Sequence, residues 1–169
     1  MASCAGSGSS GRALIACGAP FPSHNREVML IEVDVKGLTL DPVTNSPIVI
    51  LKDRTGERAL PIWINPAEAS AISMQIENVT PPRPMTHDLI RNLLFGLDAG
   101  VKKVVVCDLK EETYYATIWV EKAGKLIAVD SRPSDALAIA LRLDCPIYVE
   151  DSVLKTSKAA AMSEPGSNE

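Results

Sequence analysis

Side chains that can transfer protons or bind anions gather in two short segments of this 169-residue chain. Residues 83–88 read Arg-Pro-Met-Thr-His-Asp, and residues 130–135 read Asp-Ser-Arg-Pro-Ser-Asp. An imidazole or a carboxylate serves as a general acid or base, and a guanidinium binds anionic oxygens. His87 is one of two histidines, and the other, His24, falls in a segment with the composition of a disordered tail. His87 is therefore the one imidazole that the predicted domain offers for proton transfer.

Both segments also have an ordinary structural interpretation, because each opens a predicted helix. Thr86 has the residue type of an N-cap, and Asp88 and Asp135 lie in first turns, where a negative charge interacts favourably with the helix dipole. The second segment has a further property, since free backbone N–H groups at a helix start, together with Arg132, can bind an anion. The sequence is therefore compatible both with helix capping and with catalysis or anion binding by these residues.

The sequence context of Glu68 and of the two tryptophans favours structural roles for these residues. Glu68 lies three residues after Asn65 in a complete capping-box pattern, with Pro at the first helical position. Trp63 and Trp119 alternate with aliphatic residues in predicted strands, which favours core or interface positions over stacking on a nucleobase.

The elements that must position these residues follow from the hydrophobic periodicity. Alternating or apolar runs predict strands, and capping residues with a helical period predict helices. The predicted strands are 29–38, 48–53, 59–64, 101–109, 113–122, 125–130 and 147–150. The predicted helices begin at Pro66, after Thr86 and at Pro133; Gly100 is expected to close the second, and Leu89, Leu93 and Leu97 to be its buried face.

This order of elements predicts an α+β fold, because runs of strands and runs of helices are segregated along the chain. We expect one compact domain with a mixed or antiparallel sheet of about seven strands and three helices. Its predicted bounds are 28–154, with disordered segments at 1–27 and 155–169, where small and polar residues show no periodicity. The third helix, 133–143, is apolar nearly all round and is expected to be buried.

Composition restricts the classes of partner. Hydrophobic residues make up 46% of the chain and the formal net charge is −4, with no basic stripe, which argues against tight non-specific binding of nucleic acid. A basic patch assembled by folding stays open. None of the four cysteines forms a CxxC pair, which disfavours a zinc site and fits a reducing, cytoplasmic compartment. No stretch approaches the roughly 18 apolar residues of a membrane span, so no membrane partner is expected.

Several long motifs, in the same order, make the chain resemble the bifunctional nuclease family. They are GLTLDPVTNSPIVILKD (37–53), LPIWINPAEASAI (60–72), PPRPMTHDL (81–89), TYYA (113–116) and DSRPSDALAIAL (130–141). The resemblance covers roughly residues 28–154. It implies a compact α+β domain that hydrolyses phosphodiester bonds in both DNA and RNA.

The resemblance also implies roles for the two segments, which are then expected to converge at one cleft, within about 15 Å of each other, so that they can share a metal ion. The catalytic residues would be His87, Asp88 and Asp135. The phosphate would be bound by Arg83, Arg132 and Ser134. A divalent metal, Mg²⁺ or Mn²⁺, would be held by Asp88, Asp130 and Asp135.

The chain is also expected to form a homo-oligomer. Two rival interpretations of its function stay open. In one, the chain is a non-catalytic oligomeric or regulatory module, and the motif acids are paired with arginine and closed to solvent. In the other, the chain binds a small anion at the helix start near Arg132 without turning it over.

Overall fold

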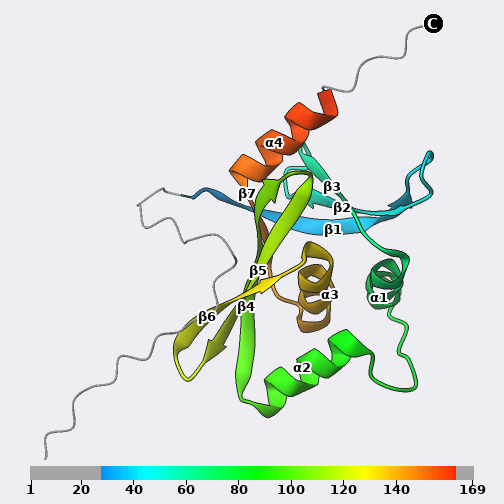
Figure 1. The fold of residues 1–169 in the computed structure, drawn as a ribbon. Helices are drawn as coiled ribbons and strands as arrows, with labels where there is room; N and C mark the ends of the chain where they lie inside the picture. The colour runs from blue at the N-terminus through cyan, green and yellow to red at the C-terminus, as the bar shows by residue number, and fades with distance from the viewer. Residues whose placement is uncertain (1–27, 163–169) are drawn as a thin grey trace, which may run out of the picture.

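The computed structural model describes residues 28–162, which form a single α+β domain (Figure 1). Expectations for residues 1–27 and 163–169 lie outside these described residues. In chain order the elements are β1 (Leu30–Leu40), β2 (Pro47–Asp53), β3 (Ala59–Trp63), α1 (Pro66–Ile76), α2 (Thr86–Gly96), β4 (Ala99–Lys110), β5 (Thr113–Lys122), β6 (Lys125–Ser131), α3 (Pro133–Leu143), β7 (Ile147–Glu150) and α4 (Asp151–Met162). The α+β class and the sheet of seven strands are confirmed.

The seven strands form one mixed sheet in the order β3-β2-β1-β7-β4-β5-β6. Two antiparallel meanders, β1-β2-β3 and β4-β5-β6, make its two halves. The short strand β7 joins the halves, because it pairs antiparallel with β1, where Ile31 lies opposite Val149, and parallel with β4, where Val105 lies opposite Tyr148. The last strand in the sequence therefore occupies the centre of the sheet.

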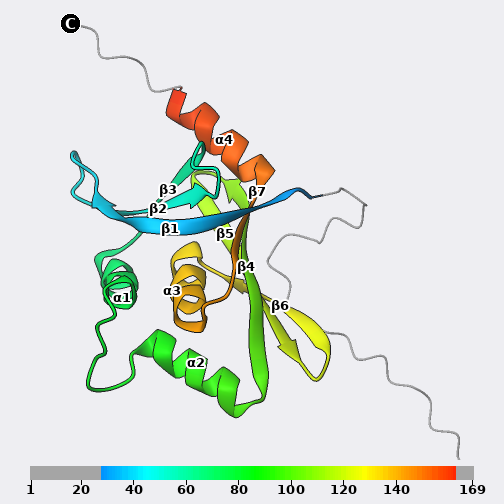
Figure 2. The same cartoon turned by 180° about the vertical axis from the view of Figure 1, so that it is seen from behind.

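Helix α3 is the centre of the domain. It lies on one side of the sheet with α1 and α2 beside it, while α4 lies beyond β1 on the other side (Figures 1 and 2). Eight of its eleven residues are buried, as its nearly all-apolar sequence predicts. Alanines at positions 136, 138 and 140 are at most 1% exposed, so neighbouring elements approach the helix closely.

The expected buried face of α2 is wrong. Leu89, Leu93 and Leu97 are 53%, 55% and 56% exposed, whereas Ile90 and Leu94 pack against the core. Both rows have helical spacing, so periodicity alone cannot choose between them. In the structure the first turn of α2 contacts α3 through the His87–Asp135 and Asp88–Arg142 pairs, and the Ile90 row packs on the core.

The ends of α2 also differ by a few residues from the expectation. Met85, and not Thr86, is the N-cap residue, and the helix ends at Gly96 with Leu97 as its C-cap. Gly100 lies inside β4 and does not close the helix. Asp98 adopts a left-handed conformation, with a φ of 51°, and turns the chain from α2 into the strand.

The fourth helix corrects both the expected number of helices and the expected end of the folded region. Helix α4 occupies residues 151–162, most of which were predicted to be tail. Val153 and Leu154 are 2% exposed, and Asp151 accepts a hydrogen bond of 3.0 Å from Arg58 Nη1. These contacts anchor the first turn, and the following run of Lys and Ala has a high helix propensity. None of the helices within residues 28–162 is long and apolar enough to cross a membrane.

Candidate functional site

Three helices begin close together, and side chains from their first turns form one continuous network. Arg132, the N-cap residue of α3, contacts Glu68 of α1 through Nη1 at 2.5 Å. Its Nε and Nη2 donate to the two oxygens of Asp135 at 2.8 and 3.2 Å. The other contact of Asp135 Oδ1 is His87 Nε2 of α2, at 3.1 Å. We call Glu68, Arg132, Asp135 and His87 the four-residue network, and through it the two predicted segments converge.

The four-residue network is buried at one end and open at the other. The side chain of His87 is 11% exposed and that of Glu68 is 12% exposed, whereas Asp135 reaches 29% and Arg132 62%. Burial raises the pKa of Asp135, but hydrogen bonds from Arg132 and then His87 outweigh it and the pKa is lowered. Asp135 is therefore a carboxylate near neutral pH. It can orient the His87 imidazole through the contact with Nε2.

Asp88 lies next to the network but is engaged elsewhere. Its Oδ2 accepts the Met85 N–H at 2.9 Å, and its Oδ1 accepts from Arg142 Nε at 2.7 Å. Arg142 has a side chain only 2% exposed, and it also donates to the carbonyls of Ala138 at 2.9 Å and Ala71 at 3.1 Å. The Asp88–Arg142 pair thus connects α1, α2 and α3, which is a structural role, and the catalytic role that the sequence suggested stays a prediction.

Arg142 is the residue of this region that sequence reasoning missed. It lies in a helix whose other buried residues are small or apolar, apart from Ser134. A basic residue in the last turn has a ready explanation in the helix dipole, so its type and position alone give no sign of a buried partner.

Three further predicted residues do not join the four-residue network. Asp130 on β6 and Arg83 before α2 are exposed, and within residues 28–162 neither forms a hydrogen bond or ion pair with it. Ser134 is 4% exposed and lines a neighbouring pocket.

The three carboxylates predicted to hold a metal are not brought together. Asp88 is paired with Arg142, and Asp130 is exposed on its strand. Across residues 28–162 there is no group of three or more His, Cys, Asp or Glu side chains arranged to hold a metal ion. The two carboxylates that do meet in the network are Glu68 and Asp135, and both contact Arg132.

Glu68 performs two tasks, and only one of them was predicted. Its Oε2 accepts the Asn65 N–H at 3.2 Å, which confirms the capping role. Its Oε1 contacts Arg132, and its side chain lines the pocket. A capping-box pattern is complete on its own, so the sequence holds no sign of this second role.

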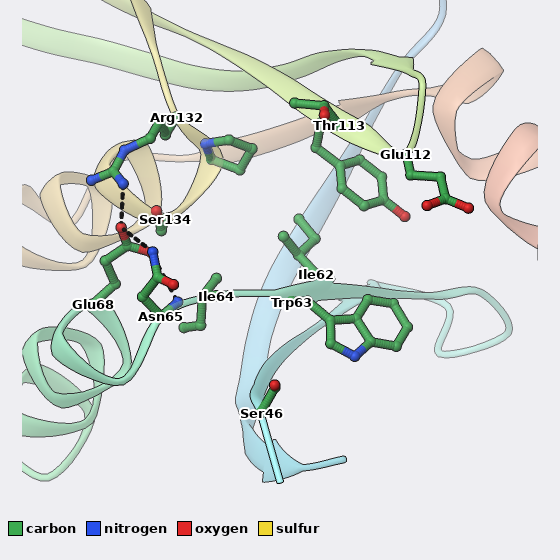
Figure 3. Close-up of a pocket in the computed structure, with 12 residues that line it drawn as sticks. Ser46, Ile62, Trp63, Ile64, Asn65, Glu68, Glu112, Thr113, Arg132 and Ser134 are labelled. Carbon is green, nitrogen blue, oxygen red and sulfur yellow. Dashed lines mark hydrogen bonds and ion pairs between the residues drawn. The ribbon is translucent and has the colours of Figure 1, made fainter. Parts of the chain in front are cut away.

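A pocket of about 400 Å³ opens directly beside Arg132 (Figure 3). Glu68 and Arg132 lie at one end, and Glu112 lies at the other, where β4 turns into β5. It is lined by Ser46, Ile62, Trp63, Ile64, Asn65, Glu68, Glu112, Thr113, Tyr114, Arg132, Pro133 and Ser134.

Of the core and interface positions that its strand pattern suggested, Trp63 does not occupy a core position. It is 53% exposed, and its indole Nε1 donates to Asp41 Oδ2 at 3.0 Å. The pKa of Asp41 is lowered to about 2, chiefly by this hydrogen bond from Trp63 and then by the backbone N–H groups of Val43 and Thr44. The charged carboxylate therefore holds the indole ring in place at the mouth of the pocket at neutral pH.

The fold and this site define an α+β domain in which a mixed sheet packs on a central helix whose N-terminus carries the polar network. The sequence profile of the bifunctional nuclease domain matches residues 49–162. The chain belongs to the bifunctional nuclease domain family.

Individual relatives fall into two groups. An uncharacterised protein of Mycobacterium tuberculosis is 46% identical over 123 residues, which cover 73% of both chains. Bifunctional nuclease 1 of Arabidopsis thaliana is 28% identical over 129 residues, 73% of this chain and 39% of that protein. Bifunctional nuclease 1 of Oryza sativa subsp. japonica is 25% identical over 112 residues, 64% of this chain and 34% of that protein. The match therefore spans little more than a third of each of these plant proteins.

Proposed function

We propose that this chain hydrolyses phosphodiester bonds in DNA and RNA at the four-residue network. Membership of the family supports the proposal, as do the names of the plant relatives. The observation that carries it is the network itself, in which an exposed arginine contacts a carboxylate and that carboxylate contacts an imidazole, while Arg132 and Glu68 also line an open pocket. Those are the parts that phosphodiester hydrolysis needs for anion binding and proton transfer.

Arg132 is the proposed phosphate-binding residue. Its three contacts with Glu68 and Asp135 engage three of the five N–H groups of a guanidinium, so two can be offered to a phosphate oxygen. The first backbone N–H groups of α3 have no partner within the helix and add a second source of anion binding. Arg83, being exposed and outside the network, has no role in this proposal.

Asp135 and His87 are the proposed proton-transfer pair. Because His87 Nε2 faces Asp135, Nδ1 is the nitrogen that would exchange a proton with water or with the substrate. Asp135 would hold the ring in one orientation and stabilise the imidazolium that forms when a proton is taken up.

A divalent metal, Mg²⁺ or Mn²⁺, also stays a proposal, with different ligands from those expected. Glu68 and Asp135 would hold it only by sharing oxygens that Arg132, His87 and the Asn65 N–H already contact. Waters and substrate phosphates would complete its shell, as is common for Mg²⁺. A metal bound there supplies activation of water and stabilisation of charge on the phosphate.

The test is cleavage of labelled single-stranded DNA and RNA with Mg²⁺, with Mn²⁺ and with chelator, using Asp135→Asn against Asp130→Asn. The two variants make the same chemical change, but only Asp135 belongs to the network. We expect Asp135→Asn to lower kcat by about 100-fold or more and Asp130→Asn to leave it unchanged. Equal rates in the two variants, or a wild type that does not cut, would overturn the proposal.

A second candidate is the non-catalytic oligomeric module, and the exposed apolar side chains of α2 favour it. Leu89, Leu93 and Leu97 form one row, and Phe95 is 85% exposed. Such groups are typical of surfaces that a partner covers, so we propose a homo-oligomer formed through α2. Sedimentation of Leu93→Glu would show dissociation, whereas Leu126→Glu, which alters a similarly exposed leucine on β6, would not.

Two other expectations also remain proposals. If the chain only binds small anions at Arg132, phosphate should raise its thermal midpoint while the cleavage assay finds no turnover. The cytoplasmic location is tested by fractionation of cells that express the chain at its natural level.

A further inference from the structure

The pocket beside the four-residue network has a chemistry different from that of the network. Charged side chains lie at its ends, Arg132 with Glu68 at one and Glu112 at the other (Figure 3). Between them the lining is aromatic and aliphatic, with the hydroxyl and amide groups of Ser46, Asn65, Thr113 and Ser134 interspersed. A flat group that is largely apolar and carries several hydrogen-bonding atoms fits such a lining.

The charged side chains that line the pocket determine which part of a ligand can lie inside it. Among residues 28–162, Arg132 is the one cation that lines the pocket, and it stands at the end nearest the network. Glu112 at the far end repels a second phosphate. An anionic ligand therefore lies with its phosphate at Arg132 and its uncharged part inside the pocket.

Two aromatic side chains supply surfaces for that uncharged part. Trp63 is 53% exposed, and the Asp41 hydrogen bond fixes the orientation of its ring before any ligand arrives. Tyr114, at the start of β5, lines the same pocket and is partly buried against the core. A ring already held in one orientation loses little conformational entropy when a ligand stacks on it.

We propose that this pocket is a nucleobase subsite, which takes one unstacked base of a nucleic acid whose phosphate lies on Arg132. The inference rests on the proposed function and adds to it the part of the substrate that the pocket recognises. The pocket volume of about 400 Å³ lies within the usual range for small-ligand sites, which suits a single nucleotide unit. Stacking on Trp63 is the principal contact with the base.

The first experiment uses the fluorescence of Trp63 itself. The sequence contains two tryptophans, so Trp119→Phe leaves Trp63 as the one reporter. Short oligothymidylate is titrated in chelator, beside an abasic oligonucleotide of the same length and charge, and gels check that both stay intact. We expect the thymidylate to quench Trp63 and the abasic strand to leave it unquenched, because only the thymidylate carries bases that can stack.

A second experiment measures affinity by the anisotropy of labelled oligonucleotides. Trp63→Leu should weaken binding of the thymidylate by about 5- to 150-fold and leave binding of the abasic strand unchanged. Trp119→Leu is the matched control, since it makes the same change at the other tryptophan, which does not line the pocket. Far-UV circular dichroism confirms that the variants are folded, and the quenching experiment needs no change at Trp63.

The outcomes separate this inference from the proposed function. Wild-type cleavage with equal quenching by both strands, or with no effect of Trp63→Leu on affinity, overturns the subsite and leaves the nuclease standing. Base-dependent quenching without cleavage in any metal supports the subsite and overturns the nuclease.

Discussion

Replacing Asp88 by asparagine tests the assignment of this residue to the fold and not to the chemistry. The substitution keeps the shape of the side chain and one oxygen that can accept the Met85 N–H. It removes the negative charge that faces Arg142 across 2.7 Å, where the arginine side chain is 2% exposed. Arg142 then keeps its bonds to two backbone carbonyls but loses its counter-charge.

The expected loss of stability follows from that burial. Breaking a buried ion pair by removing one partner costs about 3–5 kcal/mol. Since the Asp88 side chain is 16% exposed and asparagine still accepts hydrogen bonds, we expect the lower end, about 3 kcal/mol. With a typical urea dependence of about 2 kcal/mol per molar, the unfolding midpoint should fall by about 1.5 M.

The difference in stability between wild type and Asp88→Asn should depend on pH. Burial raises the pKa of Asp88, but hydrogen bonds from the Met85 N–H and from Arg142 outweigh it, so the pKa is lowered on folding. A lowered carboxyl pKa contributes stability that is present above the unfolded pKa and is lost as pH falls through the folded one. The gap between wild type and variant should therefore be full near neutral pH and shrink below about pH 4.

Urea unfolding followed by circular dichroism measures the loss, with Asp130→Asn as the control that should change stability by less than about 0.5 kcal/mol. One result would refute the reasoning. If Asp88→Asn unfolds like wild type and yet loses cleavage as Asp135→Asn does, Asp88 is a catalytic residue after all.

Three further outcomes are expected. Glu68→Gln keeps the capping oxygen but removes the charge facing Arg132, so cleavage should fall by about tenfold or more while unfolding free energy drops by no more than about 1 kcal/mol. Burial raises the pKa of Asp53, but hydrogen bonds, chiefly from the Arg58 side chain, lower this pKa from its ordinary 3.8 to about 2. The charged Asp53 therefore stabilises the folded state above about pH 3.8, and this stabilisation is lost as the pH falls towards 2. Arg58→Gln should flatten that acid dependence in urea titrations. Burial also raises the pKa of Cys145 to about 11, so peptide mapping after iodoacetamide at about pH 8 should find this thiol alkylated only once urea has unfolded the chain.

Periodicity and capping were sufficient to predict most of the secondary structure. The strand 113–122 and the helix 133–143 agree with β5 and α3 at both ends. Alternation with a period of two, and a proline at the first helical position, are local signals that need no knowledge of the partner elements. The reliance on apolar periodicity explains the failure at 151–162, where Val153 and Leu154 precede a run that has helix propensity but no large apolar residue three or four positions beyond them.

Only part of the candidate site could be predicted from the sequence. His87, Arg132 and Asp135 were selected because their types suit proton transfer and anion binding, and the structure joins them in one network. Glu68 was assigned to capping alone, and Asp88 to catalysis, because each choice depended on a partner far away in the chain. The Asp88–Arg142 contact spans 54 positions, and no spacing rule reaches that distance.

The sequence by itself determined the alternation that makes seven strands, the apolar character that buries α3, and the residue types available for chemistry. Only the tertiary structure decided which row of α2 faces inwards, which acid meets Arg142 and which meets Arg132, and that Trp63 stands at a pocket. The physical reason is that patterns along a chain report local preferences, whereas the pairing of charges and the exposure of a face depend on which surfaces pack together.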